Sequence, residues 1–178
     1  MARSRMLSTA VLLALLVTVL LSLPGDGGQA VAVEPRVATA KIMIPAAAFI
    51  PGASWMSYTG GEFLMTPDTA SFFAPLAFPV PVVNIKSITV YARDMQPDDS
   101  VCVYLYRSSP IHGRDGVKFQ GQACTTDSGA DPQAVTNLRR IYPSLVNTAV
   151  HGSYLWASVT GGSFLYGVQV TFTYQTTP

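Results

Sequence analysis

The sequence is poor in charge, in histidine and in cysteine, and each shortage excludes a class of function. Charged residues make up 12% of the 178 residues, with 11 basic against 10 acidic side chains. Nucleic acids and anionic membranes bind proteins through an excess of Lys and Arg, so this balance argues against both partners. The two cysteines have no neighbouring histidine and therefore do not make a zinc site. No stretch matches a cofactor fingerprint, so we expect no metal and no cofactor.

The N-terminus has the parts of a secretory signal peptide. Arg3 and Arg5 supply a positive start, and an uncharged run over residues 7–23 follows them. Pro24 ends the run, because proline cannot continue a helix. Ala30-Val31-Ala32 then fits the small-residue pattern of a cleavage site. The segment is therefore predicted to direct export.

Cleavage is predicted before Val33, which removes residues 1–32 and leaves residues 33–178 as one secreted domain. Cleavage before Val31 is the second choice. An uncleaved membrane anchor is the alternative, because the apolar run is about long enough to span a bilayer. Two basic residues and one acidic residue lie in the removed segment, so the mature part has no net charge. After cleavage we expect no stable insertion into a membrane.

Cys102 and Cys124 are the two cysteines of the chain. In an exported protein such a pair predicts a disulfide. The bridge would close a loop of about 22 residues, worth roughly 3 kcal/mol in the chain-entropy model. Two free thiols are the alternative.

The helical period is almost absent from the mature part, which favours an all-β fold. Short β-branched and aromatic runs alternate with turn clusters. We predict about eight or nine strands in an antiparallel two-sheet sandwich, jelly-roll-like, after an N-terminal signal helix. Two turns are predicted to close hairpins: the polar turn 94–99, and Gly161-Gly162 between strands 153–159 and 164–174.

Alternation along three strands predicts which side chains face the core. The expected core positions are Ile88, Val90, Ala92, Val101, Val103, Leu105, Leu155, Ala157 and Val159. The same alternation turns five aromatic side chains outward, namely Tyr91, Tyr104, Tyr106, Tyr154 and Trp156. Exposed aromatic rings stack on sugars or anchor partner proteins, so these five are the candidate ligand-binding residues. The opposite parity, or loops that cover the rings, would bury them instead.

No set of residues predicts catalysis or metal binding. His112 and His151 each precede a glycine, and no nucleophile elbow or base–nucleophile pair accompanies them, so they are interpreted as turn residues. The aspartates at 94, 98 and 99 and at 127 and 131 have the oxygen ligands that calcium uses. Neither cluster has the full acidic spacing of a calcium loop, so both are interpreted as polar turns.

The strand patterns of residues 89–93, 103–107 and 165–174 resemble those of small secreted bacterial β-sandwich proteins without an assigned activity. The similarity covers most of the mature chain. The resemblance implies a jelly-roll-like sandwich and transfers no functional residue. Carbohydrate-binding modules are similar in architecture, which is an analogy at the level of fold alone.

Together these features favour a non-enzymatic exported binding or surface domain. Its expected partner is a glycan, recognised through the exposed aromatic side chains, or another surface protein. A second hypothesis is a structural subunit of an extracellular assembly that self-associates through its sheet edges. A hydrolase is the third hypothesis.

Overall fold

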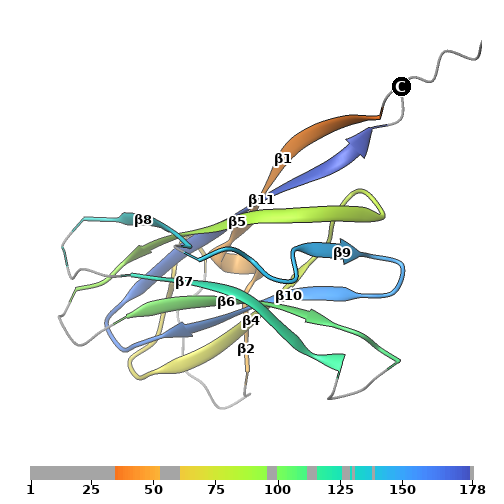
Figure 1. Ribbon diagram of the computed structural model, residues 1–178. Helices are drawn as coiled ribbons and strands as arrows, with labels where there is room; N and C mark the ends of the chain where they lie inside the picture. Colours follow the sequence, from red (N-terminus) through yellow and green to blue (C-terminus); the bar gives the residue numbers. More distant parts are fainter. Residues whose placement is uncertain are drawn as a thin grey trace, which may run out of the picture. The chain divides into compact units, whose positions relative to one another are not determined.

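The computed structural model describes residues 35–52, 61–95, 100–111, 116–125, 129, 131–137 and 139–176. These residues form two antiparallel sheets, with a short 3₁₀ turn, η1 (Ala46–Ala48), between the first two strands (Figure 1). The six-stranded sheet contains β1 (Arg36–Pro45), β3 (Leu64–Met65), β5 (Val82–Arg93), β8 (Gln133–Thr136), β9 (Leu145–Asn147) and β11 (Phe164–Thr176). The five-stranded sheet contains β2 (Ile50–Pro51), β4 (Ala70–Leu76), β6 (Val101–Ser108), β7 (Lys118–Cys124) and β10 (Gly152–Val159).

This architecture confirms the predicted all-β, two-sheet antiparallel sandwich. The predicted signal helix and both cleavage sites lie outside the described residues. Within the described part of the chain, no helix is long and apolar enough to cross a membrane.

The six-stranded sheet is built around the last strand. Its order is β1-β11-β5-β8, with β3 also paired to β11 and β9 to β5. The first and last strands pair over their whole length in β1, from Arg36 opposite Thr176 to Pro45 opposite Gly167. Figure 1 shows these two strands side by side. Segments that are far apart in the sequence therefore pair in this sheet.

The five-stranded sheet has the order β2-β4-β10-β6-β7. Its middle strand, β10, pairs with β4 on one side and with β6 on the other. Strand β7 pairs with β6 and forms one edge of the sheet.

Both predicted hairpins are wrong, although their strands exist. Strand β5 belongs to the six-stranded sheet and β6 to the other, and the same separation holds for β11 and β10. Each turn therefore carries the chain from one sheet to the facing sheet. Alternation shows which face of a strand is buried, but paired strands and facing strands both turn apolar side chains inward. The pattern could not distinguish the two arrangements.

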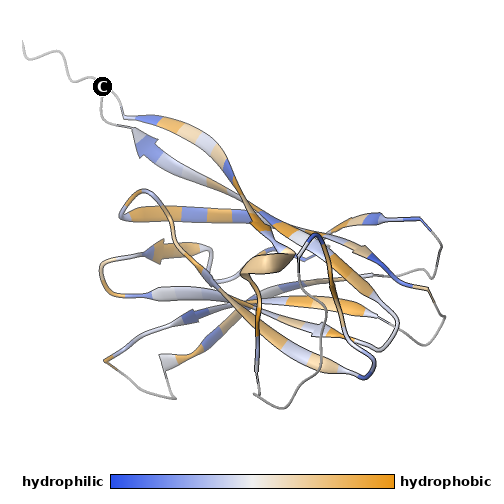
Figure 2. Ribbon diagram, turned by 180° about the vertical axis from the view of Figure 1, so that it is seen from behind, coloured by the Kyte–Doolittle hydropathy of each residue, from blue (hydrophilic) through white to orange (hydrophobic). Residues whose placement is uncertain are grey.

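The core lies between the sheets, and the predicted parity is confirmed. All nine predicted core residues are completely buried. Phe72 of β4 and Phe172 of β11 are the largest side chains of the whole core. Figure 2 shows the resulting alternation of apolar and polar residues along the strands. Each fully buried side chain of this size contributes about 1.5–3 kcal/mol.

The predicted disulfide is confirmed, and it marks the register of β6 and β7. Cys102 and Cys124 lie directly opposite each other and are bonded. Further along the pair the register shifts, so that Gly121 lies opposite Leu105 but Phe119 lies opposite Tyr106. Gln120 is the additional residue of this bulge.

The bulge reverses the side-chain parity of β7. Gln122 is exposed and Gly121 and Gln120 are both buried, after which Phe119 turns outward and is 49% exposed. Glycine fits this position because a Cβ at Gly121 would lie 3.1 Å from Cγ1 of Ile141. The bulge therefore places an aromatic ring on the outer face that strict alternation would place inside.

Candidate functional site

The outer faces of the two sheets differ in chemistry. On the six-stranded sheet, one row across the strands is Met43, Gln169, Thr89 and Thr136, and the next row contains Lys41, Thr171 and Ser87. The hydroxyls of Thr89 and Thr136 are hydrogen-bonded at 2.8 Å. These two rows are mostly polar, and a separate aromatic cluster of Phe63, Phe164 and Tyr166 lies where β3 pairs with β11.

The outer face of the five-stranded sheet is aromatic. The register places Phe73, Trp156 and Tyr104 in one row across β4, β10 and β6. A second row contains Tyr154, Tyr106 and Phe119, on β10, β6 and β7. We call these six side chains the aromatic face. None of the six is an acidic or basic residue.

Cross-strand stacking orients the four central rings. The ring centroids of Tyr104 and Trp156 are 5.0 Å apart with an interplanar angle of 28°. Those of Tyr106 and Tyr154 are 5.3 Å apart at 13°. Neighbouring strands lie about 4.8 Å apart, so rings stacked at this distance stand upright on the sheet. The surface therefore presents ring edges, and the edge of each upright tyrosine carries its hydroxyl.

Phe119 is oriented differently from these rings. Its ring is inclined by 65° to Tyr106 at 5.8 Å and by 56° to Tyr104 at 6.4 Å. No ring among the described residues stacks on either of its faces. Since the side chain is also 49% exposed, Phe119 is the ring of the aromatic face on which a flat apolar ligand has room to lie.

The hydroxyls of Tyr106 and Tyr154 remain neutral at physiological pH. Burial raises the pKa of Tyr106 above 10, and the neighbouring Tyr104 raises it further. Burial also raises the pKa of Tyr154, with a further contribution from Tyr106. A neutral phenol both donates and accepts hydrogen bonds, which suits a ligand with hydroxyl groups.

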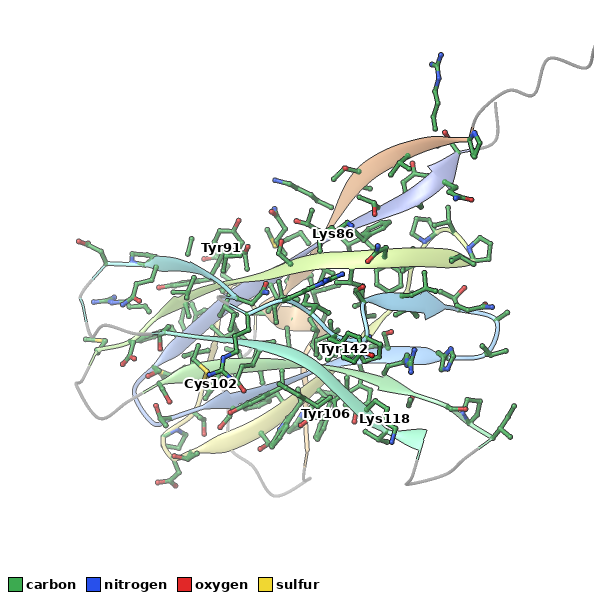
Figure 3. All side chains as sticks on the ribbon, in the orientation of Figure 1. Lys86, Tyr91, Cys102, Tyr106, Lys118 and Tyr142 are labelled. Carbon is green, nitrogen blue, oxygen red and sulfur yellow. A yellow bond between two sulfur atoms is a disulfide. The ribbon has the colours of Figure 1, made fainter. Side chains whose placement is uncertain are left out.

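Four of the five predicted site residues lie together on the aromatic face. The fifth, Tyr91, lies on β5 opposite Gly167 and Ala134, in the other sheet. Figure 3 shows Tyr91 and Tyr106 on opposite sides of the domain. Tyr91 is therefore not part of the same surface.

The sequence reasoning missed Phe73 and Phe119. Phe73 follows a second phenylalanine, so aromatic character alone does not tell which of the pair faces outward. Phe119 depends on the bulge, for which Gly121 was the available signal. Both rings extend the aromatic face toward its edges.

A groove of about 700 Å³ lies beside β7. Residues 119–124 of that strand form one wall, and five residues between 135 and 142 form the other. Arg139 and Arg140 are exposed in this lining, whereas Gln120 is buried. Phe119 lines the groove as well as the aromatic face. The two surfaces are therefore continuous.

Two of the residues considered for catalysis or calcium, His151 and Asp94, have structural contacts. Nδ1 of His151 lies 3.3 Å from the carbonyl oxygen of Asn147 in a turn. Asp94 is buried and accepts a hydrogen bond of 2.9 Å from the hydroxyl of Thr125. Among the residues that the structure describes, no group of three or more His, Cys, Asp or Glu could hold a metal ion. His112, Asp98, Asp99 and Asp127 lie outside the described residues.

No protein-family model matches the chain, and no curated protein is significantly similar to it. Among solved structures, the chain is similar to the C-terminal carbohydrate-binding module of a laminarinase from Zobellia galactanivorans. The identity is 12% over 74% of this chain and 99% of that one, with a TM-score of 0.42.

Two further similarities involve longer proteins. A xylanase from Clostridium thermocellum, solved with xylohexaose, is 8% identical over 82% of this chain and 30% of its own, with a TM-score of 0.49. The mosquito-larvicidal Cry4Aa toxin from Bacillus thuringiensis is 11% identical over 78% of this chain and 24% of its own, with a TM-score of 0.43. The chain thus spans less than a third of either protein. At these identities and scores, the function has to be argued from the surface of the chain itself.

Proposed function

We propose that residues 33–178 form an exported, non-enzymatic binding domain that holds a glycan on the aromatic face. The observation that carries this proposal is the band of six uncharged aromatic side chains across four neighbouring strands. A contiguous exposed apolar surface on a protein domain is a typical interaction site. The other sheet has two polar rows and a smaller cluster of three rings, Phe63, Phe164 and Tyr166, rather than a band across four strands.

The mixture of groups on this face suits a sugar. A pyranose has apolar C–H faces and a rim of hydroxyls. Phe119 presents an unstacked, half-exposed ring for the C–H face. Tyr104 and Tyr106 stand next to it with hydroxyls that donate and accept hydrogen bonds. A purely apolar partner would leave those hydroxyls unpaired at a cost, which favours a hydroxylated ligand.

The test is a glycan array followed by calorimetric titration of the glycans that bind. Trp156→Ala removes the ring that contacts Phe73, Tyr104 and Tyr106, and should abolish or strongly weaken binding. Tyr91→Ala is the matched control, because it removes a partly buried ring from the other sheet. Circular dichroism checks that both variants fold. Absence of binding to every glycan, or equal losses in the two variants, would contradict the proposal.

Self-association is a second candidate, supported by the edge of the six-stranded sheet. Strand β1 is ten residues long and pairs with β11 on one side. No strand of the described chain pairs with its other side. Such an edge offers a row of backbone groups to another chain. Sedimentation equilibrium over a wide concentration range tests this, and a monomer throughout would exclude it.

A further inference from the structure

We propose that the groove beside β7 selects glycans that carry carboxylate groups, with Arg139 and Arg140 as the residues that recognise the acid. This inference rests on the proposed function, because it names the class of glycan that the same continuous surface would prefer.

The groove and the aromatic face share one residue. Phe119 contacts Tyr104 and Tyr106 on the aromatic face and also lines the groove. A sugar chain that lies on Phe119 can therefore continue past the edge strand into the groove. The next sugar along the chain would then meet the opposite wall, which contains the two arginines.

The charge of the groove has one sign. Arg139 and Arg140 are both exposed, and neither has an ion-pair partner among the residues that the structure describes. Among the residues that the structure describes, no acidic side chain lines the groove. The guanidinium group is a planar donor that matches a carboxylate through two parallel hydrogen bonds. Since the mature chain has no excess of basic residues, these two arginines are a local feature rather than part of a general positive surface.

The arginine segment is fixed to β7 by hydrogen bonds. The backbone N–H of Tyr142 donates to the carbonyl oxygen of Gln120 at 2.8 Å. The side-chain amide of Gln120 donates to the carbonyl oxygen of Pro143. The side-chain amide of Asn137 donates to the carbonyl oxygen of Arg139 at 2.6 Å. These contacts hold the second wall in place before a ligand arrives.

Gln120 adds an unused hydrogen-bond acceptor. The side chain is 2% exposed, and its Oε1 atom has no partner among the described residues. A buried polar atom without a partner costs free energy, and a ligand hydroxyl would satisfy it once the groove lining shifts to expose the atom. The site thus offers a ring face, an acceptor and two cations. These match the C–H face, the hydroxyl and the carboxylate of a uronic acid.

The experiment compares acidic glycans with the same glycans after their charge has been removed. Homogalacturonan, alginate and glucuronoxylan oligomers are titrated beside their methyl-esterified or carboxyl-reduced counterparts. We expect at least one acidic glycan to bind about tenfold more tightly than its neutral counterpart, which corresponds to about 1.4 kcal/mol. Raising the salt concentration should weaken the binding of the acidic glycan only, because salt screens the attraction between its carboxylates and the arginines.

The variants separate this inference from the proposed function. Arg139→Gln with Arg140→Gln should remove the preference for the acid, so that the acidic glycan and its neutral counterpart bind with equal affinity. Arg36→Gln, an exposed arginine on β1, is the matched control and should change neither affinity. Equal affinity for acidic and neutral glycans, or a preference that survives in the double variant, would overturn this inference and leave the proposed function intact. Failure of every glycan to bind would overturn both.

Discussion

Phe119→Ala is the variant that most directly tests how the bulge in β7 builds the site. The side chain is 49% exposed, so about half of its surface contributes to stability. Full burial of a phenylalanine is worth about 1.5–3 kcal/mol, which gives about 1 kcal/mol for this ring. Its inclined contacts with Tyr104 and Tyr106 add about 0.5–1.5 kcal/mol. We therefore expect the free energy of unfolding to fall by about 1.5–2.5 kcal/mol.

Phe172→Ala provides the comparison from the core. Phe172 is completely buried and packs against Phe78 with centroids 5.0 Å apart. Truncation of such a side chain costs about 3–5 kcal/mol, so this variant should unfold at a clearly lower denaturant concentration. Chemical denaturation followed by tryptophan fluorescence measures both variants.

The same two variants should separate stability from binding. Phe119→Ala should weaken glycan binding by about tenfold under conditions in which it is folded, because the ring on which the sugar stacks is lost. Folded Phe172→Ala should bind as the unmodified chain does. If Phe119→Ala destabilised the domain as much as Phe172→Ala, the ring would belong to the core and the reversed parity of β7 would be refuted. Unchanged affinity in Phe119→Ala would refute its role in binding.

Three further predictions follow from other parts of the chain. Replacing Cys102 and Cys124 by serine should lower the free energy of unfolding by about 3 kcal/mol, because the bridge closes a loop of about 22 residues. Urea denaturation measures this change, and an unchanged midpoint would contradict the prediction. Because the pKa values of Tyr106 and Tyr154 are raised above 10, their contribution to stability is complete below pH 10 and is lost as the pH rises through the folded-state pKa values. Denaturation midpoints between about pH 8 and pH 11 should therefore fall less in the variant with Tyr106→Phe and Tyr154→Phe, and identical slopes would be inconsistent with the shifts. Expression of the whole chain in a secreting host should yield a product that begins at Val33, or at Val31 as the second choice, and N-terminal sequencing that returns Met1 would exclude cleavage.

Much of the site could be predicted from the sequence because side-chain parity is a local property. Alternation around Leu105 and Leu155 was enough to turn Tyr104, Tyr106, Tyr154 and Trp156 outward, and the structure confirms that parity. The disulfide could also be predicted, because export and the number of cysteines suffice.

The remaining features depend on contacts between distant segments. Tyr91 and Tyr106 have the same local pattern, and only the assignment of β5 and β6 to different sheets separates them. Arg139 and Arg140 became candidates only once hydrogen bonds from Tyr142 and Gln120 placed their segment beside β7. No local pattern in residues 137–143 predicts that contact.

The position of β11 has a consequence for the order of folding. This strand, Phe164–Thr176, is the last in chain order among the described strands and lies between β1 and β5, so the six-stranded sheet lacks its central member until residues 164–176 have been synthesised. Loop-closure entropy opposes contacts as distant as Arg36 with Thr176, which makes this pairing slow to form. The six-stranded sheet therefore cannot be completed while the segments before β11 are being made. That delay would suit the export that we predict from the N-terminal segment, because a translocation channel admits an extended chain.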